Sequence, residues 1–230
     1  VSFTQVTTGS YEVGTSLTPS YNAKMSAGSY QYGPATGLTA NSWNVNLRKG
    51  NTAVQNKTTA SGTFSAIVLA DGDSYTINAE ASYDDAAIPV TNKGNPYVEG
   101  QIKAGRVNQT SSTISCYRNT FYGTTANKDS LDSPTIRALN KTNKALKAGD
   151  SVTITLPVGA VRVVFAYPAT LRDITSVKDI NGLNAEIVSA FKKETITVAG
   201  AGNDAGISYK VFTTEFAAPL ESANSYKVTI

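Results

Sequence analysis

The stretch DGDSYTI, residues 71–77, decides the fold class of this 230-residue chain. In it Tyr75 follows an acidic glycine turn and precedes the apolar Ile77 by two residues. This is the arrangement of a tyrosine corner, with Ile77 where an antibody domain carries its second cysteine. Trp43, the only tryptophan, lies about thirty residues earlier, where such domains keep a large buried aromatic side chain. The alternative is that Tyr75 is simply one of 12 tyrosines, placed on an ordinary strand.

The sequence on either side of this stretch has the pattern of short strands separated by turns. β-Branched and aromatic residues alternate with polar ones, and turn residues such as Gly33-Pro34 and Lys93-Gly94-Asn95 lie between the runs. Together with the tyrosine corner, this spacing predicts an immunoglobulin-like β-sandwich. The expected strands of the first half are 11–13, 16–27, 42–47, 62–69, 74–83 and 97–103.

The second half is also strand-rich, and we expect a second β-sandwich with one or two short helices. Ser133 as N-cap and Pro134 at the first helical position predict a short helix near 133–140. Residues 184–191 fit a second helix, a loop or a strand, and residues 200–206 a flexible hairpin. The expected strands are 114–122, 151–156, 160–167, 195–199, 207–216 and 225–230.

A composition change marks the expected domain boundary. Residues 104–113 are small and polar, as in a linker or a strand connection. Residues 1–105 carry six basic and seven acidic groups, whereas the rest carries 14 and 10. We therefore predict an immunoglobulin-like sandwich over 1–105 and a second sandwich over 106–230.

Composition excludes several classes of chemistry. The chain has no histidine and a single cysteine, so Ser-His-Asp, Cys-His and zinc-histidine sites and an internal disulfide are excluded. A net charge of +3, thinly spread, gives no basic stripe for nucleic acid. No apolar run reaches the roughly 18–20 residues that span a bilayer. The chain opens at Val1 rather than Met, which we interpret as processing or truncation of a longer chain.

Few residues remain as candidates for catalysis or metal binding. Gly200, Gly202 and Gly206 are better explained by a hairpin than by a phosphate loop, because no Lys-Ser/Thr pair completes the motif. The pairs Asp71/Asp73 and Asp84/Asp85 could ligate calcium, but solvated turns are the simpler interpretation. Nothing selects a carboxylate pair for glycoside hydrolysis or a Ser-Lys nucleophile. We therefore predict no catalytic residue, no metal site and no cofactor.

Tyrosines are the main candidates for ligand contacts. Exposed rings stack on sugars or anchor protein partners, whereas buried rings fill a sandwich core. The cluster at Tyr30, Gln31 and Tyr32 precedes the Gly33-Pro34 turn and is the one most expected to be exposed. Cys116 lies in a strand pattern and is expected to be a buried small side chain. The other tyrosines that we considered are Tyr97, Tyr117, Tyr122 and Tyr167.

Several stretches, spread over nearly the whole chain, carry a resemblance. They are YEVGT (11–15), LTPSY (17–21), AGSYQYGPATG (27–37), YRNTFYG (117–123), IRAL (136–139), LPVGA through AYPATLRD (156–173) and VKDINGLNAE (177–186). The chain resembles modules of virion structural proteins of tailed bacteriophages. That resemblance implies a non-enzymatic protein of the virion, as capsid, neck or tail decoration or as fibre, which contacts other virion proteins and forms a homo-oligomer.

Three functional hypotheses follow. The first is a virion structural protein for assembly and surface display, in which one domain attaches to the particle and the other projects. The second is a host-surface adhesin that binds bacterial glycans through loop tyrosines such as Tyr30 and Tyr32. The third, a depolymerase that cuts capsular polysaccharide with carboxylates, has the least support. No nucleic-acid or membrane partner is expected.

Overall fold

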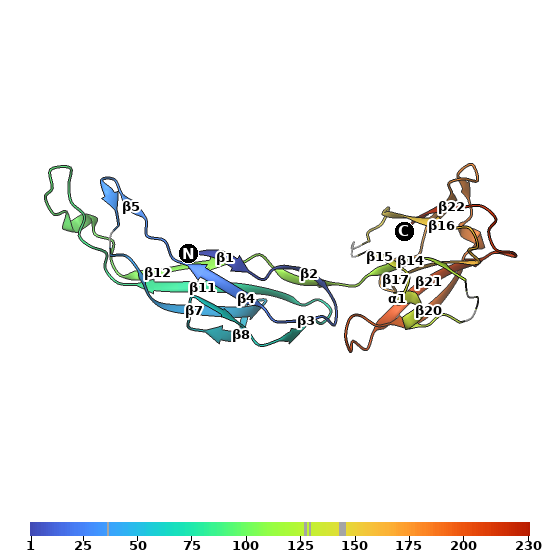
Figure 1. Cartoon of the computed structure of the whole chain (residues 1–230), viewed down its shortest axis with the longest axis horizontal. Helices are drawn as coiled ribbons and strands as arrows, with labels where there is room; N and C mark the ends of the chain where they lie inside the picture. Colours follow the sequence, from blue (N-terminus) through green and yellow to red (C-terminus); the bar gives the residue numbers. More distant parts are fainter. Residues whose placement is uncertain (36, 127, 129, 143–145) are drawn as a thin grey trace. The chain divides into compact units, whose positions relative to one another are not determined.

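The chain folds almost entirely as β-strands. The computed structural model describes residues 1–35, 37–126, 128, 130–142 and 146–230 (Figure 1). Thr36, inside one of the stretches that carry the resemblance, is outside the described residues. Contacts divide the chain into an N-terminal unit, Val1–Tyr11 with Ser16–Cys116, and a C-terminal unit, Glu12–Thr15 with Tyr117–Ile230. The predicted all-β fold is confirmed.

The N-terminal unit is a sandwich of two antiparallel sheets. One sheet has the order β1-β4-β9 and the other the order β2-β13-β11-β7-β8, with β12 also paired to β11. Strand β11 lies at the centre of the second sheet, with β7 on one side and β12 and β13 on the other. The strands are β1 (Ser2–Val6), β2 (Gly9–Glu12), β4 (Ser20–Lys24), β7 (Ala40–Lys49), β8 (Thr52–Lys57), β9 (Ser61–Thr63), β11 (Ser74–Tyr83), β12 (Gly105–Thr110) and β13 (Ile114–Tyr117). The short strands β3 (Ser16–Leu17) and β10 (Ile67–Val68) pair with each other.

Both sheets contribute to one apolar core. Tyr21 of β4 and Phe64 pack with Leu47 of β7 and Ile77 of β11, all of them buried. Trp43 was expected in the centre of this core, but it packs at its margin and is only half-buried. It lies near the start of β7, opposite Ala81, while Leu47 on the same strand face takes the fully buried position.

The predicted tyrosine corner takes an altered form. The Tyr75 hydroxyl donates to the Asp73 carboxylate at 3.2 Å, and Lys49 pairs with the same carboxylate at 2.6 Å. The backbone N–H of Ala70 also donates to Asp73. Asp73 is therefore a buried structural anion, and its interpretation as a solvated turn residue was wrong. The polar partners explain why this burial is tolerated.

The C-terminal unit is a second antiparallel sandwich. Its sheets have the orders β15-β14-β17-β21-β20 and β16-β22-β18-β19. Phe165 and Tyr167 of β17 meet Leu156 of β16 and Val228 of β22 in a core between the sheets. The strands are β14 (Thr120–Thr125), β15 (Asn140–Thr142), β16 (Ser151–Leu156), β17 (Arg162–Pro168), β18 (Ser176–Asp179), β19 (Ala185–Glu186), β20 (Lys192–Val198), β21 (Ile207–Glu215) and β22 (Asn224–Thr229).

Strand β17 is buried on both faces. Val164 and Ala166 point away from the inter-sheet core and pack with Phe121, Tyr209 and Ile136, the last from the helix α1 (Ser133–Arg137). Every residue of β17 from Arg162 to Tyr167 is consequently buried. The alternation in the sequence is real, but it separates two apolar environments rather than core from solvent.

Helix α1 begins one residue earlier than predicted. Asp132, not Ser133, is the N-cap, and its Oδ1 accepts from the Thr135 N–H at 2.8 Å. Ser133 lies inside the helix, where its hydroxyl accepts from the N–H of Ala199 at 3.0 Å. The predicted cap residue therefore ties the helix to the end of β20. In the stretch 184–191, β19 is followed by a short 3-10 turn, η2 (Val188–Ala190), in place of a helix.

Four residues from the start of the chain complete the C-terminal unit. Val13 is 1% exposed; its N–H donates to the carbonyl of Tyr117 at 2.9 Å and its carbonyl accepts from Ala201 at 2.7 Å. Glu12 pairs with Arg137 of α1 at 2.6 Å. Gly14 has a φ of +87°, and a Cβ there would lie 2.0 Å from the Ala201 carbonyl oxygen. The segment Glu12–Thr15 is thus closely fitted to its surroundings.

The glycine-rich stretch 200–206 is, as predicted, a hairpin connection, between β20 and β21. Its flexibility was expected, yet Asp204 ties it together: its Oδ2 accepts from the N–H groups of Gly200 and Gly206 at 2.7 and 3.0 Å. Arg118 donates to the same oxygen at 2.8 Å. The hydrogen bond from Arg118 is the main reason why the pKa of Asp204 lies below its ordinary value.

The structure places the division between units later than the predicted boundary at 105/106. That position falls inside β12, which pairs with β11 along its whole length. The polar side chains of 104–113 predicted a linker or a strand connection, but a strand at a sheet edge needs few apolar side chains. The expected strand 114–122 is in fact two strands, β13 and β14, and the contact division falls between Cys116 and Tyr117.

Among the described residues, no helix combines the length and the apolar character that a membrane crossing requires.

Candidate functional site

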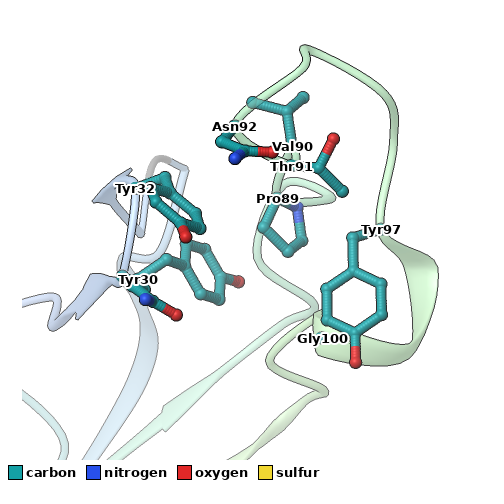
Figure 2. Close-up of a pocket in the computed structure, with 9 residues that line it drawn as sticks. Tyr30, Tyr32, Pro89, Val90, Thr91, Asn92, Tyr97 and Gly100 are labelled. Atoms are coloured by element: carbon teal, nitrogen blue, oxygen red, sulfur yellow. The ribbon is translucent and has the colours of Figure 1, made fainter.

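Two loops of the N-terminal unit line a cavity that is open to solvent (Figure 2). One is the hairpin of β5 (Ser29–Tyr30) and β6 (Gly33–Pro34). The other is the excursion 84–104, which joins β11 to β12 and contains the 3-10 turn η1 (Val98–Gly100). Turns and hydrogen bonds within each loop fix its backbone. Together the two loops carry Tyr30, Tyr32 and Tyr97, which the sequence indicated as candidates for ligand contacts.

The hairpin presents its tip residues to solvent. Tyr30 pairs with Gly33, whose φ of +140° suits glycine, and the N–H of Ala35 donates to the Gly28 carbonyl at 3.0 Å. This short turn leaves Tyr32 57% exposed. The prediction that this cluster is exposed is confirmed for Tyr32, whereas Tyr30 is half-buried.

The base of the excursion is held by several hydrogen bonds. The N–H of Ala86 donates to the carbonyl of Ile102 at 2.9 Å, and the side chain of Gln101 donates to the carbonyl of Ala86 at 2.6 Å. Asp85 accepts from the N–H of Ala104 at 2.7 Å and from Lys103 at 2.9 Å. These two donors, the N–H first, lower the pKa of Asp85. These bonds link the two ends of the excursion, residues 85–86 and 101–104, and so fix its base.

The tip of the excursion is a compact turn. The N–H of Tyr97 donates to the carbonyl of Pro89 at 2.7 Å, and the N–H of Thr91 donates to the carbonyl of Asn95 at 2.8 Å. Gly94, with a φ of +79°, closes the turn through a bond to the Thr91 carbonyl. The expected strand 97–103 is absent here; the chain instead forms η1, so the ring of Tyr97 is on a turn rather than in a sheet.

Tyr30 connects the two loops. Its hydroxyl accepts from the N–H of Ile102 at 3.2 Å and donates to the carbonyl of Ala87 at 3.4 Å. A side chain with these two contacts is part of the frame of the cavity. Tyr30 therefore positions the hairpin against the excursion, while Tyr32 beside it keeps its ring open to solvent.

The cavity between the loops has a volume of about 340 Å³. Figure 2 shows the rings of Tyr30 and Tyr32 on one side and Pro89, Val90 and Tyr97 on the other. A second hollow of about 250 Å³ shares four of these residues with it. The residues that line the larger cavity are Tyr30, Gln31, Tyr32, Pro89, Val90, Thr91, Asn92, Tyr97 and Gly100.

Gly100 sets the position of the Tyr97 ring. A Cβ at Gly100 would lie 2.5 Å from Cδ1 and 2.6 Å from Cε1 of Tyr97, closer than real contacts allow. The ring of Tyr97 thus lies against the backbone at Gly100, and it is still 49% exposed. A larger residue at this position would move the ring without removing it.

The chemistry of the lining is aromatic and uncharged. None of the nine described lining residues carries a charge. Gln31 and Asn92 offer amide donors and acceptors, and Thr91 offers a hydroxyl that already accepts from the N–H of Asn95 at 3.2 Å. Such a concave aromatic surface with a few neutral polar groups is the ordinary composition of a small-ligand site.

The other candidate residues from the sequence are partly or fully buried or form hydrogen bonds within the protein. Asp84 accepts from Asn41 at 2.8 Å, and Tyr167 is buried with its hydroxyl on the carbonyl of Arg172. Tyr117 and Tyr122 are both half-buried. Cys116 is half-buried rather than buried, and its thiol lies 2.9 Å from the carbonyl of Ala70. Within the described part of the chain, no group of three or more acidic or cysteine side chains is arranged to hold a metal ion.

Four of the nine lining residues, Tyr30, Gln31, Tyr32 and Tyr97, were candidates in the sequence. The sequence analysis named Tyr30, Tyr32 and Tyr97 as candidates for ligand contacts, but it did not predict that Tyr97 lies near the other two. It missed the residues 89–92 that form the facing wall. A signal was present in the stretch IPVTNKGNP, residues 88–96, because two prolines and a glycine exclude a regular strand and predict an exposed loop.

Comparison of the chain with protein-family models, with curated proteins and with solved structures gave no match.

Proposed function

We propose that this chain is a structural component of a tailed-bacteriophage virion, acting in assembly and surface display as a homo-oligomer among other virion proteins. The observation that carries the proposal is that each unit closes its own apolar core. Val45, Leu47 and Ile77 are fully buried in one unit, and Val163 and Phe165 in the other. Folds kept by packing suit a protein exposed on a particle.

The sequence resemblance supports the same proposal, since it extends over stretches from both units. Sheet edges give symmetric copies a surface to bury, because the backbone groups of an edge strand are unpaired on one side. Strand β8 ends one sheet of the N-terminal unit, and Val54 on it is exposed.

The test combines oligomeric state with particle binding. We expect purified protein at micromolar concentration to form a defined oligomer by size-exclusion chromatography with light scattering. We also expect it to decorate particles that were prepared without it. A protein that stays monomeric and leaves such particles undecorated would contradict the proposal.

A second candidate, a host-surface adhesin that binds bacterial glycans, is favoured by the cavity beside Tyr32. An exposed aromatic surface of this kind is costly to leave in water and usually contacts a partner. The two functions are compatible, because a displayed protein can also bind the host. The adhesin differs in requiring a ligand at the cavity.

A further inference from the structure

The geometry points to the cavity between the hairpin and the excursion as a binding site for uncharged carbohydrate, with Tyr32 and Tyr97 as its contact residues. This inference rests on the second candidate function and specifies its ligand. It adds Tyr97 and the wall formed by residues 89–92 to the tyrosines that the sequence indicated.

The placement of two aromatic rings favours a sugar as the ligand. Tyr32 and Tyr97 come from different loops, and both line the same cavity of about 340 Å³ with roughly half of their surface exposed. The face of an aromatic ring carries partial negative charge and attracts polarised C–H groups. The C–H faces of a sugar ring match this surface, and two rings on one cavity can hold adjacent parts of one oligosaccharide.

The polar groups of the lining also match a neutral sugar. Sugar hydroxyls both donate and accept hydrogen bonds, and so do the amides of Gln31 and Asn92 and the hydroxyl of Thr91. Since the Thr91 oxygen already accepts from the Asn95 N–H, its proton is available to donate. A lining without charged residues offers nothing to balance a carboxylate or a phosphate. The expected ligand is therefore neutral.

The site is largely formed before a ligand arrives. The excursion is fixed at its base by Asp85 and Gln101, and the Tyr30 hydroxyl links it to the hairpin. Fixed loops lower the entropic cost of binding. The exposed rings are thus held where a ligand would use them.

The test measures binding of the full chain to two sets of immobilised oligosaccharides. One set contains neutral polymers of glucose, galactose and N-acetylglucosamine, and the other contains the same sizes with uronic acids. We expect binding to at least one neutral oligosaccharide and at least tenfold weaker binding to its acidic counterpart. Binding to neither set, or equal binding to both, would overturn the inference.

Variants locate the site. Tyr32→Ala and Tyr97→Ala should each weaken binding at least tenfold, while Val68→Ala, an exposed apolar residue of the same unit outside the cavity, should leave it unchanged. Gly100→Ala should also weaken it, because the new Cβ displaces the Tyr97 ring. Gly28→Ala is its matched control, since a Cβ there meets nothing within 4 Å. Unchanged binding by Tyr32→Ala and Tyr97→Ala would overturn the assignment of the site.

Folding and particle binding are measured on the same variants. Fluorescence of Trp43, which lies in the N-terminal unit, reports whether that unit is folded. If glycan binding is absent while the wild-type protein decorates particles, this inference fails and the structural role stands. If neutral glycan is bound while particles are never decorated, the structural role fails and the cavity assignment stands.

Discussion

The central strands of the two units, β11 and β17, are built differently. In β11 the buried residues Tyr75, Ile77 and Ala79 alternate with partly exposed polar ones. In β17 all residues from Arg162 to Tyr167 are buried, because its second face packs in a cluster that includes Phe121 of β14, Tyr209 of β21 and Ile136 of α1. The second face of β17 is therefore covered by residues that are distant in the sequence. The second face of β11 stays partly exposed to solvent, and the N-terminal unit carries long loops.

The largest expected effect concerns the segment 12–15. Gly14→Ala should destabilise the C-terminal unit by about 3 kcal/mol or more, because a Cβ meets the Ala201 carbonyl at 2.0 Å and the backbone has positive φ. Gly72→Ala is the matched control in the N-terminal unit: its φ is +76°, but nothing lies within 4 Å, so only about 1–2 kcal/mol is expected.

Urea denaturation separates these two effects. Trp43 is the only tryptophan, so its fluorescence follows the N-terminal unit, while circular dichroism follows both units. Gly14→Ala should shift the circular dichroism transition and leave the fluorescence midpoint in place. A Gly14→Ala variant as stable as wild type would mean that segment 12–15 does not belong to the C-terminal unit.

The second prediction compares the two faces of each strand. Val163→Ala and Val164→Ala should each cost about 2 kcal/mol, because both side chains are fully buried on opposite faces of β17. On β11, Ile77→Ala should cost about 2–5 kcal/mol and Thr76→Ala less than about 0.5 kcal/mol. Equal costs for Thr76 and Ile77, or a harmless Val164→Ala, would remove the difference between the strands.

These two strands also show how far sequence reasoning reaches. Period-2 patterns predicted both, since alternation follows from strand geometry itself. They could not reveal that Ile136 and Val13, which are distant from β17 in the sequence, pack in the same unit as β17. Such contacts depend on tertiary structure. The polar stretch that forms β12 was predicted to be a linker or a strand connection for the same reason: pairing with β11, not its own side chains, holds it in the sheet.

The candidate site was predictable only in part. Tyr32 beside a Gly-Pro turn gave a local signal for exposure, and the structure confirmed it. Tyr97 and Tyr32 line the same cavity although their loops are about sixty-five residues apart in the sequence. Nothing in a single sequence specifies that two such loops lie together.

The third prediction concerns acid stability. The pKa of Asp204 is lowered, first by its hydrogen bond from Arg118. A lowered folded pKa means that this carboxylate stabilises the unit at neutral pH and that the contribution is lost as the pH falls below 3.8, the ordinary value. Asp73 acts in the same direction in the N-terminal unit: burial raises its pKa, but hydrogen bonds, that from Lys49 first, outweigh burial.

Urea midpoints measured at neutral pH and below pH 3.8 check this prediction. Asp204→Asn should lower the neutral-pH stability of the C-terminal unit and reduce the further loss in acid, while the Trp43 transition keeps its wild-type pH dependence. An unchanged acid loss in Asp204→Asn would show that other carboxylates control the C-terminal unit.

The fourth prediction concerns the start of α1, where a modest effect is expected. Asp132→Ala removes the acceptor for the Thr135 N–H and should cost about 1 kcal/mol. Ser133→Ala removes the hydroxyl that accepts from the N–H of Ala199. It therefore tests the hydrogen bond between α1 and the end of β20 instead of the N-cap hydrogen bond of Asp132. Thermal unfolding followed by circular dichroism compares them, and a larger loss for Ser133→Ala would mean that the tie outweighs the cap.

The central claim is that the chain is a structural part of a phage particle. Cryo-electron microscopy of particles made with and without the protein tests it most directly. We predict regularly repeated difference density that accounts for copies of a 24.1 kDa chain. Identical maps, with the protein recovered only outside the particles, would contradict the account.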